Sequence, residues 1–369
     1  MEQVKKILAT VGVALATTTA AFGENPATGS SVGDSSAVAV SSGVSGSSAV
    51  EGFLKSEYMP EIHGTVRAKY EYEPEIGKGR FEIRNARISL EGKVIPLVRY
   101  KAEIDLSDEG AIKMLDAYVR LQPKDKLKFT FGQMRVPFTI DAHRSPHLQY
   151  FANRSFIAKQ VGNVRDVGAA ASLTVGNEVL PMTIEGGIFN GSGLTDQKDF
   201  WTDNYNFSFK VQTLIERQWN VTLSCQKATA GSTDVMMYDA GAYWDNARWH
   251  IEAEYLRKCY DNGAFPGVNA VDAFVAYRLP LKKTATAVSF LGRYDYMSDH
   301  NKGGMDDDGR LKVDEPERHR LTGGVTISLG SKSLQADVRL NYEHYFYGDG
   351  VTPKISEQSK MVAEFVVHF

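Results

Sequence analysis

Basic side chains are concentrated in one stretch of the chain, residues 135–165. The stretch contains five lysines and arginines against a single carboxylate, Asp141, so its net charge is +4. The five basic residues are Arg135, Arg144, Arg154, Lys159 and Arg165. Alternating hydrophobicity is absent between Pro137 and about Val167, which predicts a long loop rather than a strand. Cations gathered at a narrow point of a water-filled passage would favour anions over other solutes.

The segment before this loop, FTFGQMRVPF (Phe129–Phe138), predicts how the chain enters it. Apolar and polar residues alternate from Leu127 to Phe131, as in a β-strand with one apolar face. Gly132 permits a close approach of backbone to backbone, and Pro137 cannot donate to a strand ladder. We therefore expect a strand that ends near Pro137 and a loop that leaves the sheet there.

A period of two in hydrophobicity recurs from residue 61 to the end of the chain. In 61–72, Val66 and Tyr70 share one face with other apolar residues, and Arg67 and Lys69 share the opposite face. About sixteen such segments can be counted, an even number with lengths suited to tilted membrane strands. They lie near 61–72, 80–92, 96–107, 111–122, 126–135, 166–177, 180–190, 203–215, 218–229, 235–245, 247–259, 269–280, 284–298, 318–330, 333–347 and 358–369.

The connections between these segments sort into two kinds. Short ones such as GKVI and QPKDK alternate with longer ones such as NGSGLTDQKDFWTDN. Turns on one side and loops on the other are typical of a closed barrel in lipid, which leaves no unpaired strand edge. A soluble β-sandwich or jelly roll would also alternate. The number of strands, the loop pattern and aromatic residues near strand ends, among them Tyr70, Trp219 and Tyr277, favour the barrel.

The expected fold is therefore all-β, a transmembrane antiparallel β-barrel of about sixteen strands with an inward-folded long loop after strand 5. The final segment, KMVAEFVVHF, places Met361, Phe365 and Phe369 on one face and ends on an aromatic residue. It resembles the terminal strand that the outer-membrane assembly machinery recognises in bacterial barrels.

Charged residues of both signs would line the inside of such a barrel. On the inner face of the first five strands the expected cations are Arg67, Lys69, Arg84, Arg87, Arg99, Lys101, Arg120 and Lys128. The same face carries Glu71, Glu82, Glu91, Glu103, Asp105 and Asp116. Two interpretations are open: the cations form a path for anions, or they are paired with the carboxylates and only solvate a polar interior. The alternation slips near Asn85, which indicates a bulge and leaves the facing of Arg84 and Arg87 open.

The N-terminus predicts export. Residues 1–23 have the charged start, apolar run and small residues of a signal peptide, and 24–58 form a Ser/Gly-rich flexible leader before the barrel at 59–369. The expected location is the bacterial outer membrane, with lipid around the barrel. The formal net charge of −3 gives no reason to expect nucleic-acid binding.

Other motifs carry less chemistry. GMDDDGRLKVDEPE places Asp306, Asp308 and Glu315 at EF-hand positions, but Gly304 stands at the first position and no helices flank the loop, so calcium is a weak candidate there. No Gly-x-Ser-x-Gly element is present. We expect neither an enzyme nor a cofactor.

The order of three motifs resembles the phosphate-selective porin O and P family. These are RFEIRNARISLEG (Arg80–Gly92), LDAYVRLQP (Leu115–Pro123) and GQMRVPF (Gly132–Phe138), followed by the long loop. The resemblance implies a trimeric, sixteen-stranded outer-membrane channel that passes small anions such as phosphate through a narrowed waist. Two alternatives stay open: a general diffusion porin without selectivity, and a plugged structural or adhesive surface barrel.

Overall fold

The computed structural model describes residues 58–369 except 162–164, 195–196, 231, 282–284 and 331–333. The predicted signal peptide, and the predicted leader apart from its last residue, lie outside the described residues. In the part of the chain that is described, no helix has the length and apolar character needed to cross a membrane.

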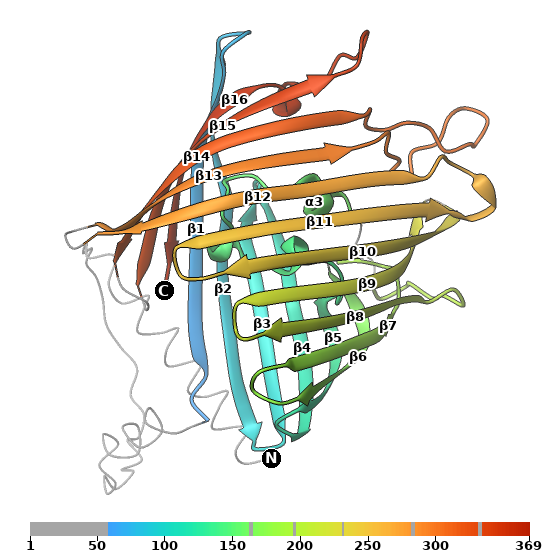
Figure 1. Cartoon of the computed structure of the whole chain (residues 1–369). Helices are drawn as coiled ribbons and strands as arrows, with labels where there is room; N and C mark the ends of the chain where they lie inside the picture. Colours follow the sequence, from blue (N-terminus) through green and yellow to red (C-terminus); the bar gives the residue numbers. More distant parts are fainter. Residues whose placement is uncertain (1–57, 162–164, 195–196, 231, 282–284, 331–333) are drawn as a thin grey trace, which may run out of the picture. The chain divides into compact units, whose positions relative to one another are not determined.

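Sixteen strands form one closed antiparallel sheet, in which each strand pairs with its sequence neighbours and β1 pairs with β16 (Figure 1). The first eight are β1 (Glu61–Glu73), β2 (Lys78–Ile95), β3 (Val98–Asp108), β4 (Ala111–Lys124), β5 (Leu127–Arg135), β6 (Arg165–Gly176), β7 (Pro181–Phe189) and β8 (Asn206–Ile215). The others are β9 (Trp219–Ala230), β10 (Thr233–Asp245), β11 (Trp249–Tyr260), β12 (Val268–Pro280), β13 (Ala285–Met297), β14 (Arg318–Gly330), β15 (Gln335–Tyr347) and β16 (Lys360–His368). The predicted barrel is confirmed.

Short helical segments occur in the connections of the described chain. Those in the loop after β5 are η1 (Asp141–His143), η2 (Pro146–Leu148) and α3 (Phe156–Gln160), and the others are η3 (Asp261–Gly263) and η4 (Ile355–Glu357). The connections that follow even-numbered strands are all short, and we call their side of the barrel the short-turn end. The opposite side, the long-loop end, carries the connection 298–317, and the loop after β5 starts there.

The two faces of the sheet have the exposure pattern of a membrane barrel. On β1 the apolar Ile62 and Val66 are 56% and 43% exposed, whereas the charged Arg67 and Lys69 are only 2% and 5% exposed. A soluble protein buries its apolar face and exposes its charges. The inverted pattern means that the apolar outer face meets lipid and the charged inner face lines the interior, which excludes the β-sandwich and jelly-roll alternatives.

Aromatic side chains cluster at the short-turn end of β9–β12. Trp219 and Trp244 lie with ring centroids 5.9 Å apart, and Trp249 and Tyr277 lie 4.6 Å apart. Trp219 and Trp249 are both exposed on the outer face. Amphipathic rings at this level form the girdle that sits at lipid headgroups, as the sequence predicted for Trp219 and Tyr277.

The last residue of the chain extends the β1–β16 pairing that closes the barrel. The backbone N–H of Phe369 donates to the Gly64 carbonyl at 3.0 Å, and the Gly64 N–H donates to the Phe369 carbonyl at 2.8 Å. A Cβ added to Gly64 would lie 2.1 Å from the Phe369 ring. With glycine at position 64 the terminal aromatic ring lies directly over β1, and a side chain there would force the ring to move.

The bulge predicted near Asn85 is present in β2. The register between β1 and β2 shifts between Arg67 and Ala68, whose partners are Asn85 and Ile83, so Arg84 is the extra residue. Both Arg84 and Arg87 nevertheless reach carboxylates, Asp108 and Asp105 respectively.

Candidate functional site

The loop after β5 leaves the sheet as predicted. β5 ends at Arg135, two residues before Pro137. Gly132 has a φ of 123°, and a Cβ there would lie 2.4 Å from the Ala117 carbonyl oxygen of β4. No other residue type fits this approach without strain. Pro137 then directs the chain away from β5 and toward strands that are not its neighbours.

The first contacts of the loop are with β8 and β9. The Ser208 hydroxyl donates to the Pro137 carbonyl at 2.6 Å, and Lys210 Nζ donates to the Thr139 carbonyl at 2.7 Å. The Thr139 N–H donates to Ser224 Oγ at 3.1 Å. Ser208, Lys210 and Ser224 are all buried on the inner face of the sheet, so the loop takes its first partners from the inner face.

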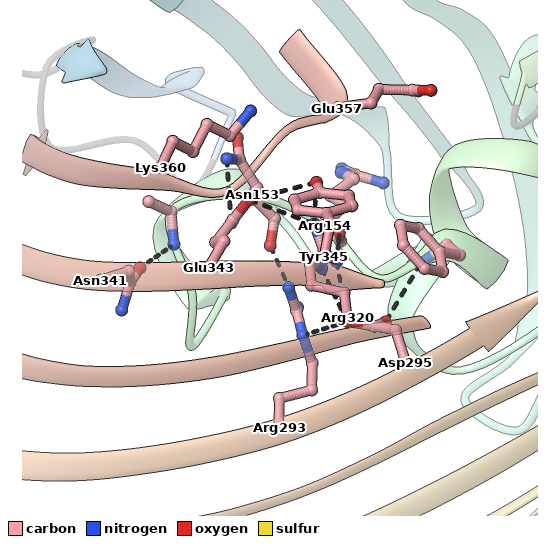
Figure 2. A network of polar contacts seen from close by, with 12 residues as sticks. Asn153, Arg154, Arg293, Asp295, Arg320, Asn341, Glu343, Tyr345, Glu357 and Lys360 are labelled. Carbon is pink, nitrogen blue, oxygen red and sulfur yellow. Dashed lines mark hydrogen bonds and ion pairs between the residues drawn. The ribbon is translucent and has the colours of Figure 1, made fainter. Parts of the chain in front are cut away.

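Four arginines from four strands donate hydrogen bonds to the middle of the loop, to its backbone carbonyls and to one side-chain amide. Arg67 of β1 donates to the Ala152 carbonyl and to Gln149 Oε1, both at 2.7 Å. Arg339 of β15 donates to the His147 carbonyl at 3.1 Å. Further along, Arg293 of β13 donates to the Asn153 carbonyl at 3.0 Å and Arg320 of β14 to the Arg154 carbonyl at 2.7 Å (Figure 2). We call Arg67, Arg293, Arg320 and Arg339 the anchoring arginines.

Carboxylates on β13 and β16 neutralise the anchoring arginines. Asp295 lies 2.8 Å from Arg293 and 2.8 Å from Arg320, and its other oxygen accepts the Phe156 N–H at 3.2 Å (Figure 2). Glu364 pairs with Arg67 at 2.6 Å and with Arg339 at 3.0 Å. A buried guanidinium is tolerated only with such partners. The anchoring arginines are therefore structural and offer little free charge to a solute.

Apolar packing fixes the loop to one side of the barrel. Phe156 and Ile157 of α3 are 3% and 0% exposed and belong to one apolar cluster with Met237 of β10, Leu256 of β11 and Met297 of β13. α3 contacts β12 and β13, while η2 contacts β1 and β16. The apolar cluster attaches the loop to strands β10–β13.

Open space lies on the other side of the loop. A cavity of about 400 Å³ is bounded by strands β3–β7 and by the loop residues Pro137, His143 and Ser145. A second cavity of about 260 Å³ lies between the loop and strands β1–β3 and β16, and it shares Lys101 and Ser145 with the first. We call the two together the wall cavities.

Cations outnumber carboxylates in the larger cavity. Its charged lining residues are Lys101, Arg120, Lys128, Arg135, Asp116 and Glu185. Lys101 is paired with Glu103 at 3.0 Å and with Asp116 at 3.3 Å. The remaining three have no carboxylate within 4.0 Å among the described residues: Arg120 donates to Thr130, and Arg135 donates to the His143 carbonyl. We call Arg120, Lys128 and Arg135 the wall cations.

The predicted lumen cations separate into paired and unpaired groups. Arg67, Lys69, Arg84 and Arg87 form ion pairs with Glu364, Glu71, Asp108 and Asp105. Arg99, which lies opposite Arg120 in the β3–β4 register, has no ion pair within the described chain. The predicted cations of β1 and β2 are thus paired. On β3–β5 Lys101 is paired as well, whereas Arg99, Arg120 and Lys128 have no ion pair among the described residues.

Most of the predicted loop cations are also paired. Arg144 lies 2.9 Å from Asp141 and 2.6 Å from Glu252, Lys159 lies 3.3 Å from Glu357, and Arg165 lies 2.7 Å from Asp116. The Glu252 and Asp141 charges raise the pKa of Arg144 despite its burial. Within the described chain Arg154 donates only to backbone carbonyls, and burial lowers its pKa to about 9. Of the five, only Arg135 lines the larger wall cavity.

Sequence reasoning did not find three of the four anchoring arginines. Arg293, Arg320 and Arg339 sit on strands whose alternation places them on the inner face, and that signal was available. Their partners are loop carbonyls as far as 192 residues away. Because a carbonyl carries no side-chain signature, no sequence pattern identifies such a contact.

The weak calcium candidate is not assembled. Glu315 pairs with Lys302 and Arg318, and these cations lower its pKa to about 2. The Asp306 carboxylate instead accepts the backbone N–H groups of Asp308 and Arg310. The described residues contain no group of three or more His, Cys, Asp or Glu side chains placed to hold a metal ion.

Known proteins share both sequence features and the fold. The family model "Phosphate-selective porin O and P" matches residues 61–297. The anion-selective porin from Comamonas acidovorans has 12% identity and a TM-score of 0.57, covering 84% of this chain and 98% of that one. The outer-membrane channel DcaP of Acinetobacter baumannii has 11% identity and a TM-score of 0.55, covering 84% and 96%. Pseudomonas putida OprB has 10% identity and a TM-score of 0.55, covering 88% and 96%. No curated protein matches the chain.

Proposed function

The chain belongs to the phosphate-selective porin O and P family, and we propose that it is an outer-membrane porin whose passage prefers small anions, phosphate among them. The observation that carries the anion preference is the group of wall cations, Arg120, Lys128 and Arg135, which line one cavity without carboxylate partners among the described residues. A cation without a partner has its charge available to a passing solute.

We infer that the loop after β5 lies inside the barrel and sets the narrowest point. Its partners support this: anchoring arginines from β1, β13, β14 and β15 reach it from the inner face. Its apolar residues pack on β10–β13. The passage would then run between the loop and the β1–β7 wall, through the wall cavities, rather than down the barrel axis.

The passage favours anions because of where its unpaired cations lie, not because of how many cations it contains. The first stretch of wall, β1 and β2, carries cations that are neutralised by carboxylates. The wall cations and Arg99 occupy β3–β5 and have no ion pair among the described residues. A one-sided cationic strip in a narrow, water-filled gap lowers the energy of an anion and raises that of a cation.

Replacing the wall cations tests this assignment. In a variant with Arg120→Gln, Lys128→Gln and Arg135→Gln, the anion-to-cation permeability ratio in a planar bilayer should fall severalfold while channels still open. Lys126→Gln, in the turn between β4 and β5, is the matched control because it removes a positive charge outside the wall cavities. Equal reversal potentials for the triple variant and the control would show that the wall cations do not set selectivity.

Assembly and processing belong to the same proposal. A solved structure similar in fold, OmpT of Vibrio cholerae, is described in its trimer form, with 10% identity and a TM-score of 0.53. We expect a homotrimer, which native mass spectrometry of the detergent-solubilised protein would resolve from a monomer. We also expect removal of residues 1–23, so the mature protein should begin at Glu24 by N-terminal sequencing.

The general diffusion porin is the second candidate. A general diffusion porin would have the same barrel and loop. Its wall cations would have to be so well hydrated that they do not discriminate between anions and cations. The adhesive or plugged barrel requires a closed passage, and the two wall cavities count against it. Conductance with no ion preference would favour the general diffusion porin. An absence of conductance would favour the adhesive or plugged barrel.

A further inference from the structure

A groove runs over the outer face of the sheet, across strands β8–β11. Its volume is about 530 Å³, and we call it the outer groove. Four large side chains form its walls and are between 45% and 58% exposed: Phe209, Leu223, Tyr238 and Tyr255. Their surfaces are therefore accessible to whatever surrounds the barrel.

Two small side chains, Cys225 of β9 and Ala240 of β10, form the floor of the outer groove. Residues that are directly paired on neighbouring strands share a face of the sheet. In this register Cys225 lies between the wall residues Phe209 and Tyr238. Ala240 likewise lies between the other two wall residues, which are on β9 and β11. The hollow is thus a product of the sequence, which sets small side chains between large ones on two adjacent strands.

One end of the outer groove carries a positive charge. Arg257 of β11 is paired with Tyr238 in the register and lies near the end of its strand, on the long-loop side. Its guanidinium donates to Asn269 Oδ1 at 2.9 Å, and a Cβ on Gly267 would lie 2.4 Å from Nη2. Among the described residues no carboxylate lies within 4.0 Å of Arg257. The chain therefore positions this cation without neutralising it.

The neighbours of Arg257 on the outer face place it at the edge of the apolar band. Toward the short-turn end β11 presents Tyr255, Ile251 and Trp249, all exposed. A charge in the middle of such a band is costly, whereas a charge at its edge meets the lipid headgroups. Because the long loops of outer-membrane barrels face the cell exterior, Arg257 lies at the headgroup level of the outer leaflet.

We propose that the outer groove binds a membrane lipid with an anionic phosphate head group, with the phosphate at Arg257 and an acyl chain over Cys225 and Ala240. The outer face meets lipid, so acyl chains are the surroundings of the groove, and its floor lets one chain lie closer to the sheet than elsewhere. A guanidinium binds phosphate in a bidentate manner, which adds a preference for the anionic head. The inference goes beyond the channel function and does not depend on ion selectivity.

Native mass spectrometry of the detergent-solubilised protein tests the head-group contact. The probe is dioleoylphosphatidylglycerol, and the matched lipid is dioleoylphosphatidylcholine, in which choline cancels the phosphate charge. The first bound phosphatidylglycerol should bind about tenfold more tightly, the effect of one hydrogen bond to a charged group. Arg257→Gln should abolish this preference. Equal binding of the two lipids to the unmodified protein would overturn the proposal.

Lys227→Gln is the matched control for the charge. Lys227 shares the outer face of β9 with Cys225, is paired with Asp234 at 2.9 Å and does not line the outer groove. The preference for phosphatidylglycerol should persist in this variant. Equal losses of preference in Arg257→Gln and Lys227→Gln would mean that surface charge in general attracts the lipid, and would overturn the site.

Filling the floor tests the acyl-chain contact. Ala240→Leu should weaken the binding of both lipids severalfold, whereas Ala273→Leu, which adds the same side chain to the outer face of β12 outside the groove, should not. A second copy of the chain is the alternative occupant. Loss of the trimer in Ala240→Leu with unchanged lipid binding would assign the groove to a contact between copies and overturn the lipid site.

Discussion

At the scale of single residues, the inside of this barrel uses arginine in two ways. Arg320 lies between Asp295 and Glu343 and donates to a loop carbonyl, so its charge is already compensated. Arg120 and Arg135 line a cavity and donate to uncharged groups. Whether an arginine has a carboxylate partner or an uncharged one therefore decides how much of its charge is available to a solute.

Removing an anchoring arginine should loosen the loop. Arg320→Gln leaves Asp295 with one fewer cation and the Arg154 carbonyl with a weaker donor, and breaking such a buried pair costs about 3–5 kcal/mol. Single-channel recordings should then show noisier or larger currents, and the thermal midpoint should fall. Arg80→Gln, which removes a half-exposed arginine from the β1–β2 hairpin, is the control. Unchanged current noise in Arg320→Gln would contradict an anchoring role.

His147 should make the fold sensitive to acid. Burial and then the neighbouring His368, whose ring stacks on it at 3.7 Å, lower the pKa of His147 from 6.5 to about 4. The unfolded chain therefore binds a proton at a pH where the folded protein does not, so stability falls as pH drops from about 6.5 to about 4 and then levels off. As the pH falls across this range, the thermal midpoint of the wild type should fall relative to that of His147→Gln. A constant difference between them would contradict the assignment.

At the scale of elements, the strands were predictable and the loop contacts were not. A period of two with one charged face fixed all sixteen strands to within three residues, and Pro137 marked the exit from β5. Pairing could not be predicted, because Arg67 and Glu364 meet only when the barrel closes, 297 residues apart. Sequence likewise could not show that Arg144 would meet Glu252 and so lose its free charge.

The short helix α3 should depend on its apolar contacts. Ile157 is fully buried at the centre of the cluster, so Ile157→Ala leaves a void and should cost about 2–5 kcal/mol. Leu148→Ala, in the same loop but 58% exposed, should cost far less. Urea unfolding of both variants in detergent measures the difference. Similar losses in the two would mean that the cluster does not hold the loop.

At the scale of the whole molecule, β1 and β16 close the barrel, and the contact of the last residue with β1 extends their pairing. Gly64→Ala would place a methyl group against the Phe369 ring, whereas Gly323→Ala on β14 meets no atom within 4 Å. We expect Gly64→Ala to lower the yield of folded barrel, seen as the mobility shift of unheated protein in gel electrophoresis, and Gly323→Ala to leave it nearly unchanged. Equal yields of the two variants would show that the position of the Phe369 ring does not affect closure of the barrel.

The barrel is also asymmetric across its interior. Three of the four anchoring arginines and most of the apolar cluster lie on β9–β15, and the fourth, Arg67, lies on β1. The wall cavities and their cations lie mainly along β1–β7. If ions pass along that strip, selectivity is a property of the intact channel and not of any one residue.

The reversal potential of the unmodified protein in a planar bilayer, under a potassium chloride gradient at neutral pH, tests this account most directly. We expect a reversal potential shifted from zero toward the chloride equilibrium potential, and a smaller shift at higher salt, where the wall cations are screened. A potential at zero, or on the potassium side, would contradict an anion-preferring passage.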